Sequence, residues 1–138
     1  MPLIVWSYPR GAAIDAKGGR DCFYAVDYAA RTASELGADL VKVNFPQPDK
    51  QSGVPEPYRR EFSPAEAIGA VVRSANRTLL LVSGGEQAGD QAMLEKARLS
   101  MEAGATGLIF GRNVFQRSHG DSLRLVAQLR EILAKYPS

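Results

Sequence analysis

The feature that most constrains the fold is the alternation of four short apolar runs with four segments of helical spacing. The apolar runs lie at residues 3–6, 40–43, 78–82 and 107–110. The first, Leu-Ile-Val-Trp, shows no polar alternation, which is typical of a strand covered on both faces in a parallel sheet. Strands that alternate with helices predict an α/β protein with a parallel sheet, here in the order βαβαβαβα.

Start and stop signals support the helical half of this pattern. The predicted helices cover residues 21–36, 63–75, 90–103 and 121–135. The second begins most clearly, because Ser63 caps the backbone, Pro64 suits the first helical position and Glu66 completes a capping box. The last is amphipathic, with an apolar side formed by Leu123, Val126, Leu129, Ile132 and Leu133. Residues 46–62, which contain four prolines, are predicted to be a loop without regular structure.

Composition limits the class of protein. The chain has 138 residues, of which 45% are apolar and 23% charged, as expected for one globular domain that spans residues 1–138. A net charge of +2 with dispersed basic residues indicates neither a nucleic-acid partner nor a membrane partner. Because Cys22 is the only cysteine, an internal disulfide is impossible and a cytoplasmic location is expected. No apolar stretch approaches the roughly 20 residues of a membrane span.

Two architectures fit four βα units. The pattern alone is compatible with an open, flavodoxin-like sheet and with part of a (β/α)₈ barrel. Four units are too few for a complete barrel, which needs about 250 residues. In both architectures ligands bind at the carboxyl ends of the strands, and every predicted strand here ends in polar or glycine residues.

Lys42 is the most unusual residue at these strand ends. It lies in a predicted strand between Val41 and Val43, and lysine is rare in strands and seldom buried. Burial in an apolar wall disfavours the charged ammonium and leaves a neutral amine, which can attack a carbonyl and form a Schiff base. The same window also fits a lysine at a sheet edge in solvent, or one paired with a carboxylate.

Two strand ends that contain glycine predict an anion site. A Ser-Gly-Gly sequence follows the third strand at 83–85, and Gly-Arg follows the fourth at 111–112. Glycines let backbone N–H groups approach an anion closely, and the arginine adds a charge-assisted hydrogen bond. Phosphate sites of barrels often lie after strands seven and eight beside a short extra helix, which residues 113–116 are suited to begin. Tight turns without a ligand are the alternative.

Tyr8 and Trp6 lie beside the end of the first strand. The Tyr8 hydroxyl is suited to proton transfer, while Trp6 either shapes and dries the site or packs in the core. The only histidine, His119, lies in a Ser-His-Gly-Asp segment that is typical of a surface loop. No cluster of His, Cys, Asp and Glu has the spacing of metal ligands, so neither a metal nor another cofactor is expected.

Four motifs together resemble the archaeal-type class I fructose-bisphosphate aldolases, a group that also occurs in bacteria. They lie at residues 6–11 (WSYPRG), 38–42 (ADLVK), 83–86 (SGGE) and 107–116 (GLIFGRNVFQ). Their order and their spread over nearly the whole chain make the match specific. The loop after Lys42 and the SGGE motif are most similar to the bacterial branch.

The resemblance implies a (β/α)₈ barrel, of which this chain holds strands five to eight as four parallel βα units. It implies that Lys42 is the Schiff-base lysine, that Tyr8 transfers protons and that Trp6 lines the site. The implied reaction is the reversible cleavage of fructose 1,6-bisphosphate by a metal-independent lyase of glycolysis and gluconeogenesis. The substrate phosphate is then held by Ser83, Gly84, Gly85, Gly111 and Arg112.

The family's first four strands, with an acidic residue on strand one, have no counterpart here, because Met1 and Pro2 directly precede the fifth strand. We therefore expect a fragment of a longer aldolase, with impaired activity at this length. The alternatives are related chemistry on another phosphorylated sugar, including transaldolase or thiolase chemistry, and an inactive half-barrel that self-associates. A homo-oligomer is expected, since pairing with a second copy would hide the open edges of the sheet.

Overall fold

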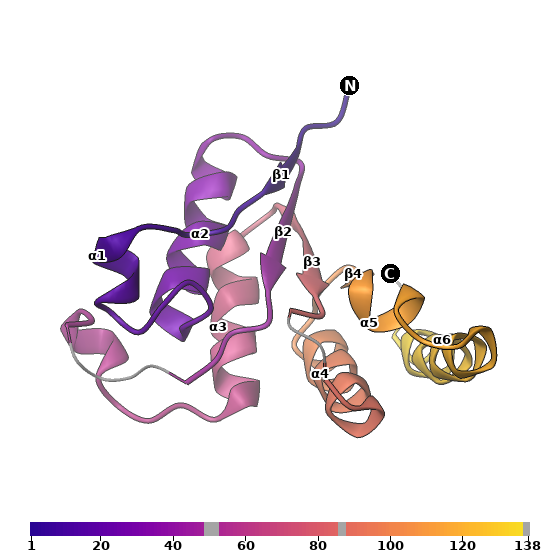
Figure 1. Ribbon diagram of the computed structural model, residues 1–138. Coiled ribbons are helices and arrows are strands. Elements are labelled where there is room, and N and C mark those ends of the chain that lie inside the picture. Colours follow the sequence, from indigo (N-terminus) through magenta and orange to yellow (C-terminus); the bar gives the residue numbers. More distant parts are fainter. Residues whose placement is uncertain (49–52, 86–87, 137–138) are drawn as a thin grey trace.

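A four-stranded parallel sheet forms the centre of the computed structural model, which describes residues 1–48, 53–85 and 88–136. The strands are β1 (Ile4–Trp6), β2 (Leu40–Asn44), β3 (Leu79–Ser83) and β4 (Gly107–Ile109), and they lie in the order β1-β2-β3-β4 (Figure 1). Every neighbouring pair is parallel. The prediction of a parallel sheet is confirmed, and its strands follow one another in chain order.

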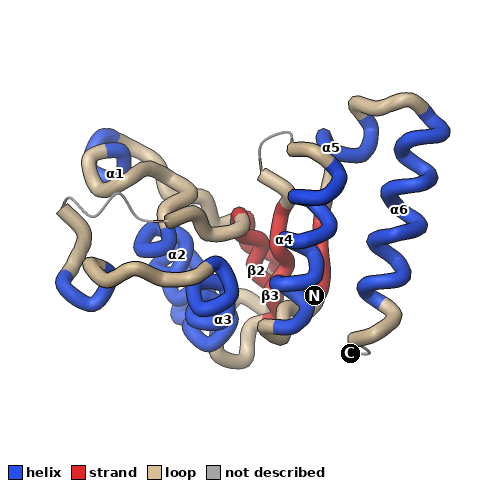
Figure 2. Tube along the Cα trace, turned by 90° about the horizontal axis from the view of Figure 1, so that it is seen from below, coloured by secondary structure: helices blue, strands red, loops and turns tan. Residues whose placement is uncertain are grey.

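Long helices follow the strands and cover one side of the sheet. They are α2 (Phe23–Glu35), α3 (Pro64–Ala75), α4 (Asp90–Glu102) and α6 (His119–Leu133), while α1 (Ala12–Asp15), α5 (Arg112–Phe115) and the 3-10 helix η1 (Glu56–Tyr58) are short. Consecutive long helices pack against one another in chain order, and Figure 2 shows them succeeding one another beside the strands. An open doubly wound sheet would carry helices on both faces. The arrangement is instead half of a (β/α)₈ barrel, as predicted.

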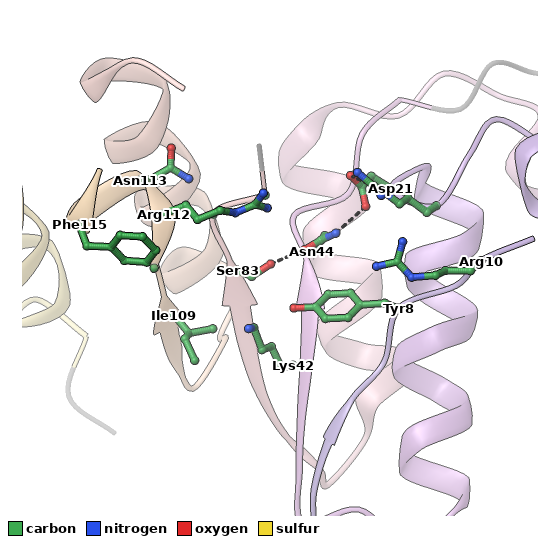
Figure 3. A pocket seen from close by; sticks show the side chains of 14 residues that line it. Tyr8, Arg10, Asp21, Lys42, Asn44, Ser83, Ile109, Arg112, Asn113 and Phe115 are labelled. Atoms are coloured by element: carbon green, nitrogen blue, oxygen red, sulfur yellow. Dashed lines mark hydrogen bonds and ion pairs between the residues drawn. The ribbon is translucent and has the colours of Figure 1, made fainter. Parts of the chain in front are cut away.

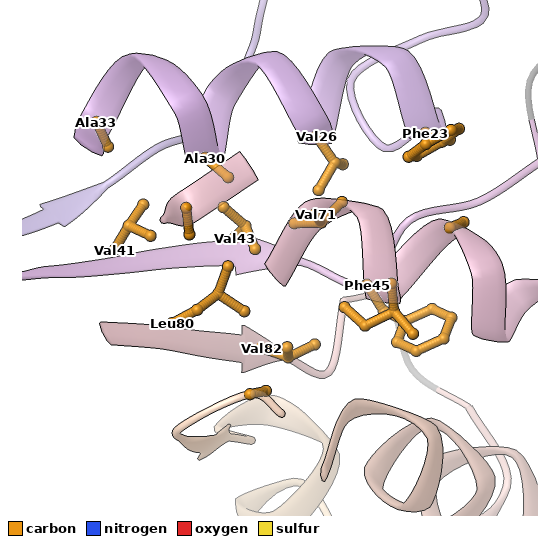
Figure 4. Close-up of a cluster of buried hydrophobic side chains, with 14 of the residues drawn as sticks. Phe23, Val26, Ala30, Ala33, Val41, Val43, Phe45, Val71, Leu80 and Val82 are labelled. Atoms are coloured by element: carbon orange, nitrogen blue, oxygen red, sulfur yellow. The ribbon is translucent and has the colours of Figure 1, made fainter. Parts of the chain in front are cut away.

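The hydrophobic core lies between the sheet and these helices (Figure 4). Val41 and Val43 of β2 and Val82 of β3 are fully buried there, together with Val26 of α2 and Ile68 of α3. Alternate residues of a strand point to opposite faces of the sheet, so this one set of valines belongs to a single face. The core therefore uses only the helix-facing half of each strand.

The other face of the sheet is uncovered, which corrects the prediction that the first strand is covered on both faces. Ile4, Trp6 and Leu79 all point away from the core, and they keep 55%, 66% and 51% of their surface exposed. In a complete barrel this face is the interior, where side chains from all eight strands pack in layers. Four strands supply only half of that packing.

Two further local predictions are wrong. Leu123, predicted to lie on the apolar side of the last helix, is exposed, whereas Leu125 is fully buried. The reason is that α6 packs on α4 through Leu125 and Leu129. A residue two positions from Leu125 lies on nearly the opposite side of the helix. The segment 46–62 is also not wholly irregular, since it contains the 3-10 turn at residues 56–58. Residues 49–52 of that segment lie outside the described residues.

The predicted start of α3 is confirmed in detail. The Ser63 hydroxyl accepts a hydrogen bond from the Glu66 backbone N–H at 3.2 Å, and the Glu66 carboxylate accepts one from the Ser63 N–H at 2.8 Å. These bonds satisfy backbone donors that the first turn of a helix leaves unpaired.

Replacing Ser63 by alanine is expected to lower the free energy of unfolding by about 1 kcal/mol, because the N-terminal cap of α3 is lost. Urea unfolding followed by circular dichroism measures the change. The matched control is Ser74→Ala in the same helix, where the serine is inside the helix and does not cap it. A loss in Ser63→Ala no larger than in this control would contradict the capping role.

Candidate active site

The uncovered face of the sheet presents its side chains in register. Trp6 pairs with Lys42, and Lys42 pairs with Leu81, so these three residues lie in one row across the strands. The next row toward the carboxyl ends holds Asn44 and Ser83. Because paired residues of parallel strands point to the same face, the lysine and the polar strand ends share one surface.

A cavity of about 410 Å³ lies at the carboxyl ends of the strands. It is lined by Tyr8, Arg10, Arg20, Asp21, Lys42, Asn44, Ser83, Gly84, Gly85, Ile109, Gly111, Arg112, Asn113 and Phe115 (Figure 3). Every predicted site residue except Trp6 is among them. The fold thus brings together residues that are more than 100 positions apart in the chain, as the rule for βα proteins predicts.

Lys42 is half-buried in the middle of β2, whereas the sequence predicted a buried residue at the end of the strand. Its apolar neighbours Val41 and Val43 point into the core on the opposite face and therefore do not bury it. Of the two alternatives, the ion pair is absent, since no carboxylate among the described residues pairs with Lys42. Nor is it at a sheet edge, because β2 lies between β1 and β3.

Aromatic rings hold the lysine in place instead. The Lys42 Nζ lies 4.2 Å from the centroid of the Trp6 ring and 5.7 Å from that of Tyr8, within the range of cation–π contacts. Trp6 is therefore beside the Lys42 amine, although it does not border the cavity and does not pack in the core. Once deprotonated, the amine no longer makes a cation–π contact, and its lone pair is available to a carbonyl carbon.

The cavity is strongly cationic. Arg10, Arg20, Lys42 and Arg112 contribute four positive side chains, against one carboxylate, Asp21, among the described lining residues. A concave surface with one sign of charge attracts ligands of the opposite sign. The site is therefore suited to an anionic ligand.

The two glycine-containing strand ends meet at one end of this cavity. Gly84 is buried and Gly85 has a φ of +70°, a conformation that favours glycine. After β4, Gly111 leads into the short helix α5, which confirms the predicted extra helix. Asn113 of α5 connects the two ends, because its Oδ1 accepts a hydrogen bond of 2.9 Å from the Ala88 backbone N–H.

Replacing Gly84 by alanine is expected to lower the free energy of unfolding by about 1–3 kcal/mol, because the site is too tightly packed for a methyl group. The new Cβ would lie 2.8 Å from Asn113 Nδ2 and 3.1 Å from Phe110 Cδ1. Gly120→Ala in α6 is the control, since its nearest neighbour is 3.9 Å away and alanine favours a helix. Equal stability of the two variants in thermal unfolding would contradict the close packing.

Comparison with known proteins agrees with this arrangement. A family model described as DeoC/LacD family aldolase matches residues 1–117. The chain belongs to this family of aldolases. A class 1 fructose-bisphosphate aldolase of Thermoproteus tenax is 37% identical over 134 residues, which are 96% of this chain and 43% of that protein. A 2-amino-3,7-dideoxy-D-threo-hept-6-ulosonate synthase of Halobacterium salinarum is 31% identical over 118 residues, or 86% of this chain and 37% of that protein.

Solved structures of aldolases share the fold. An archaeal fructose-1,6-bisphosphate aldolase, whose catalytic lysine is covalently bound to the carbinolamine intermediate of the substrate, superposes with a TM-score of 0.74 at 32% identity. The match covers 96% of this chain and 45% of that one. The resemblance to class I aldolases is thereby confirmed. This aldolase-family chain spans less than half the length of the relatives it matches.

Several lining residues of this aldolase-family chain have no predicted role from the sequence. Arg20 and Asp21 lie in the segment before α2, which begins at Phe23, whereas the sequence pattern placed Asp21 at the start of the helix predicted over residues 21–36. Arg10 lies inside the WSYPRG motif, which was the available signal, and Asn44 is one of the polar residues at the strand ends. Asp21 belongs with the site because its Oδ1 accepts a hydrogen bond of 2.6 Å from Asn44 Nδ2.

A second polar pair lies away from the cavity, under the segment at residues 53–62. The Tyr58 hydroxyl donates a hydrogen bond of 2.6 Å to Oδ2 of Asp27, a buried residue of α2. Burial and this hydrogen bond raise the pKa of Tyr58 well above its usual range, because ionisation would place a second negative charge beside the carboxylate. The pair attaches the loop to α2, next to the ring of Phe23.

Proposed function

We propose that the chain carries the Schiff-base half of an aldolase active site, and that the substrate of the complete enzyme is fructose 1,6-bisphosphate. The observation that carries this proposal is Lys42, a lysine without a carboxylate partner among the described residues, held against two aromatic rings in a cationic cavity. Names of relatives support the substrate, since the Thermoproteus tenax relative is a fructose-bisphosphate aldolase.

The proposed reaction starts with attack of the neutral Lys42 amine on the substrate ketone. Loss of water from the resulting carbinolamine leaves an iminium. Tyr8, whose ring borders Lys42, removes the proton from the hydroxyl group next to the bond that breaks. The electron pair of the broken carbon–carbon bond moves into the iminium, which becomes an enamine, and glyceraldehyde 3-phosphate leaves. Protonation of the enamine and hydrolysis then release dihydroxyacetone phosphate and restore the amine.

Binding of the phosphate supplies orientation in this proposal. The phosphate of the ketose end, away from the bond that breaks, is held by a phosphate corner formed by Ser83, Gly84, Gly85, Gly111 and Arg112. Binding energy from such a remote group places the ketone at the amine, which makes the attack effectively intramolecular. The three arginines of the cavity, Arg10, Arg20 and Arg112, favour a substrate with more than one phosphate.

The complete reaction needs the other half of the barrel. The described part of the chain leaves the face around Lys42 open, and water there competes with the substrate. We therefore propose that this chain by itself forms the imine but turns over slowly. We also propose that it belongs to a longer cytoplasmic enzyme. No helix among the described residues is long and apolar enough to span a bilayer.

Borohydride trapping tests the proposal. The chain is incubated with dihydroxyacetone phosphate, reduced, digested and examined by mass spectrometry. The expected result is one reduced adduct, on Lys42, at a yield well above that of the surface lysines. Equal labelling of Lys17, Lys96 and Lys135, or no adduct at all, would contradict the Schiff-base role.

The synthase from Halobacterium salinarum supports a second candidate function, in which the same lysine acts on a different phosphorylated sugar. Its similarity covers 86% of this chain, at 31% identity. Trapping with a panel of phosphorylated ketoses and aldoses in competition separates the two candidates. Better protection of Lys42 by another sugar phosphate than by fructose 1,6-bisphosphate would favour the second.

A further inference from the structure

A hydrogen-bonded chain of three side chains crosses the cavity wall. Asn44, the last residue of β2, donates from Nδ2 to Oδ1 of Asp21 at 2.6 Å. The hydroxyl of Ser83, the last residue of β3, donates to Oδ1 of the same Asn44. Figure 3 shows Asn44 between the other two side chains. The carboxamide thus connects the segment before α2 to the strand end that leads into Gly84 and Gly85.

The two bonds define one orientation of the carboxamide. Asp21, as a carboxylate, only accepts hydrogen bonds, so the NH₂ group of Asn44 must face it. The Asn44 oxygen then faces Ser83 and accepts the hydrogen bond that its hydroxyl donates. Reversing the amide would put an oxygen against the carboxylate and break the bond to Asp21, whereas Ser83 could still accept a hydrogen bond. The Ser83 hydroxyl proton is consequently committed within the protein and is not free for a ligand.

Packing alone does not hold the side chains of Asp21 and Asn44, whereas Ser83 is buried. A second cavity of about 230 Å³ lies behind the first, and Asp21, Asn44, Gly84 and Gly85 border both. Side chains in a thin wall between two cavities have few neighbours to restrain them, so hydrogen bonds determine their position. The bond to an ionised partner is the stronger kind.

We propose that Asn44 is a positioning residue that holds the turn at residues 83–85 in the shape that binds phosphate. This inference rests on the proposed function, because it takes that turn as the phosphate site. It revises the role of Ser83, whose hydroxyl is a tether to Asn44. The contacts to phosphate then come from the backbone N–H groups of Gly84 and Gly85 and from Arg112.

The test exchanges the side chains at positions 44 and 21. In Asn44→Asp two carboxylates face each other, and the donor to Asp21 is lost. In the double variant Asp21→Asn with Asn44→Asp, the new amide donates to the new carboxylate, whose second oxygen still accepts from Ser83. The double variant has the same net charge as the original protein, so a general electrostatic effect does not account for recovery.

Inorganic phosphate is the probe, titrated against the ¹⁵N-labelled chain while the amide signals of Gly84 and Gly85 are followed by NMR. We expect Asn44→Asp to weaken phosphate binding about tenfold or more, in line with the loss of a charge-assisted hydrogen bond. The double variant is expected to recover most of the affinity. Unchanged affinity in the single variant, or a double variant no better than the single one, would overturn the positioning role.

Spectra recorded without ligand test the positioning role of Asn44 separately from the proposed phosphate site. If the original protein binds no phosphate, the phosphate corner is wrong, and the Gly84 and Gly85 signals without ligand decide the role of Asn44. Positioning is supported if the Gly84 and Gly85 signals shift or broaden in Asn44→Asp and return to their original positions in the double variant. Signals that stay the same in all three proteins overturn it. Core signals, such as that of Val43, report whether each variant is folded.

Discussion

Substituting methionine for Lys42 is expected to abolish the adduct trapped with dihydroxyacetone phosphate and to reduce any aldol cleavage by at least about a thousandfold, the scale of losing a nucleophile. Methionine fills similar volume but has no amine to attack the ketone. The side chain at position 42 is half-buried beside the Trp6 ring, which suits methionine, so we expect the variant to remain folded. Intact mass spectrometry after reduction measures the adduct directly.

Lys42→Arg separates the nucleophile from its charge. Arginine keeps a cation over the Trp6 ring, yet its guanidinium stays protonated and forms no imine. We expect Lys42→Arg to lose the adduct as completely as Lys42→Met. Lys96→Met, which removes a lysine that lies outside the main cavity, is the matched control and should keep it. An adduct that survives in either Lys42 variant would show that the amine of Lys42 is not the nucleophile.

The open face of the sheet is expected to make the chain self-associate. Its accessible surface is 8075 Å², whereas a monomer of 14.9 kDa is expected to expose about 7,000 Å². The excess of roughly 1,000 Å² is close to the ~800 Å² that each partner buries in a standard interface. Two copies around a two-fold axis would supply eight parallel strands, since β1 and β4 are the free edges of the sheet.

Leu79→Glu is expected to raise the dimer dissociation constant about tenfold or more, because association would bury an unpaired carboxylate. Leu79 is 51% exposed on the uncovered face, and Leu36, which is 72% exposed beside the end of α2, gives the control Leu36→Glu. Sedimentation velocity over a range of concentrations measures both. If the unchanged chain sediments as a monomer throughout, or if Leu36→Glu dissociates it equally, the open face is not the interface.

Much of the candidate site was predictable because the position of a ligand site in a parallel α/β fold follows from its topology. Once the strands are known to be parallel, their carboxyl ends must meet at one edge, and the polar residues at those ends must share a cavity. Tyr8, Lys42 and the glycine-containing ends at 83–85 and 111–112 were found in this way. Arg20 and Asp21 were not, because the segment before α2 enters the cavity by a route that no local pattern indicates.

The environment of Lys42 shows where local sequence misleads. Flanking valines indicated burial, but residues next to each other in a strand face opposite sides of the sheet. Val41 and Val43 are therefore buried in the core while Lys42 faces the open side. Leu123 and Leu125 of α6 show the same limit, because which side of an amphipathic helix is buried depends on the helix it meets.

By itself, the sequence determined the order of the strands and helices, the start of α3 and the chemistry available at the strand ends. These features depend on periodicity, capping and residue type, which act over a few neighbouring positions. Only the tertiary structure decided that the helices cover one side of the sheet, that Lys42 rests against Trp6, and that Asn44 joins Asp21 to Ser83. Those contacts join residues 23 to 39 positions apart, and only the packing of βα units on one another brings such residues within bonding distance.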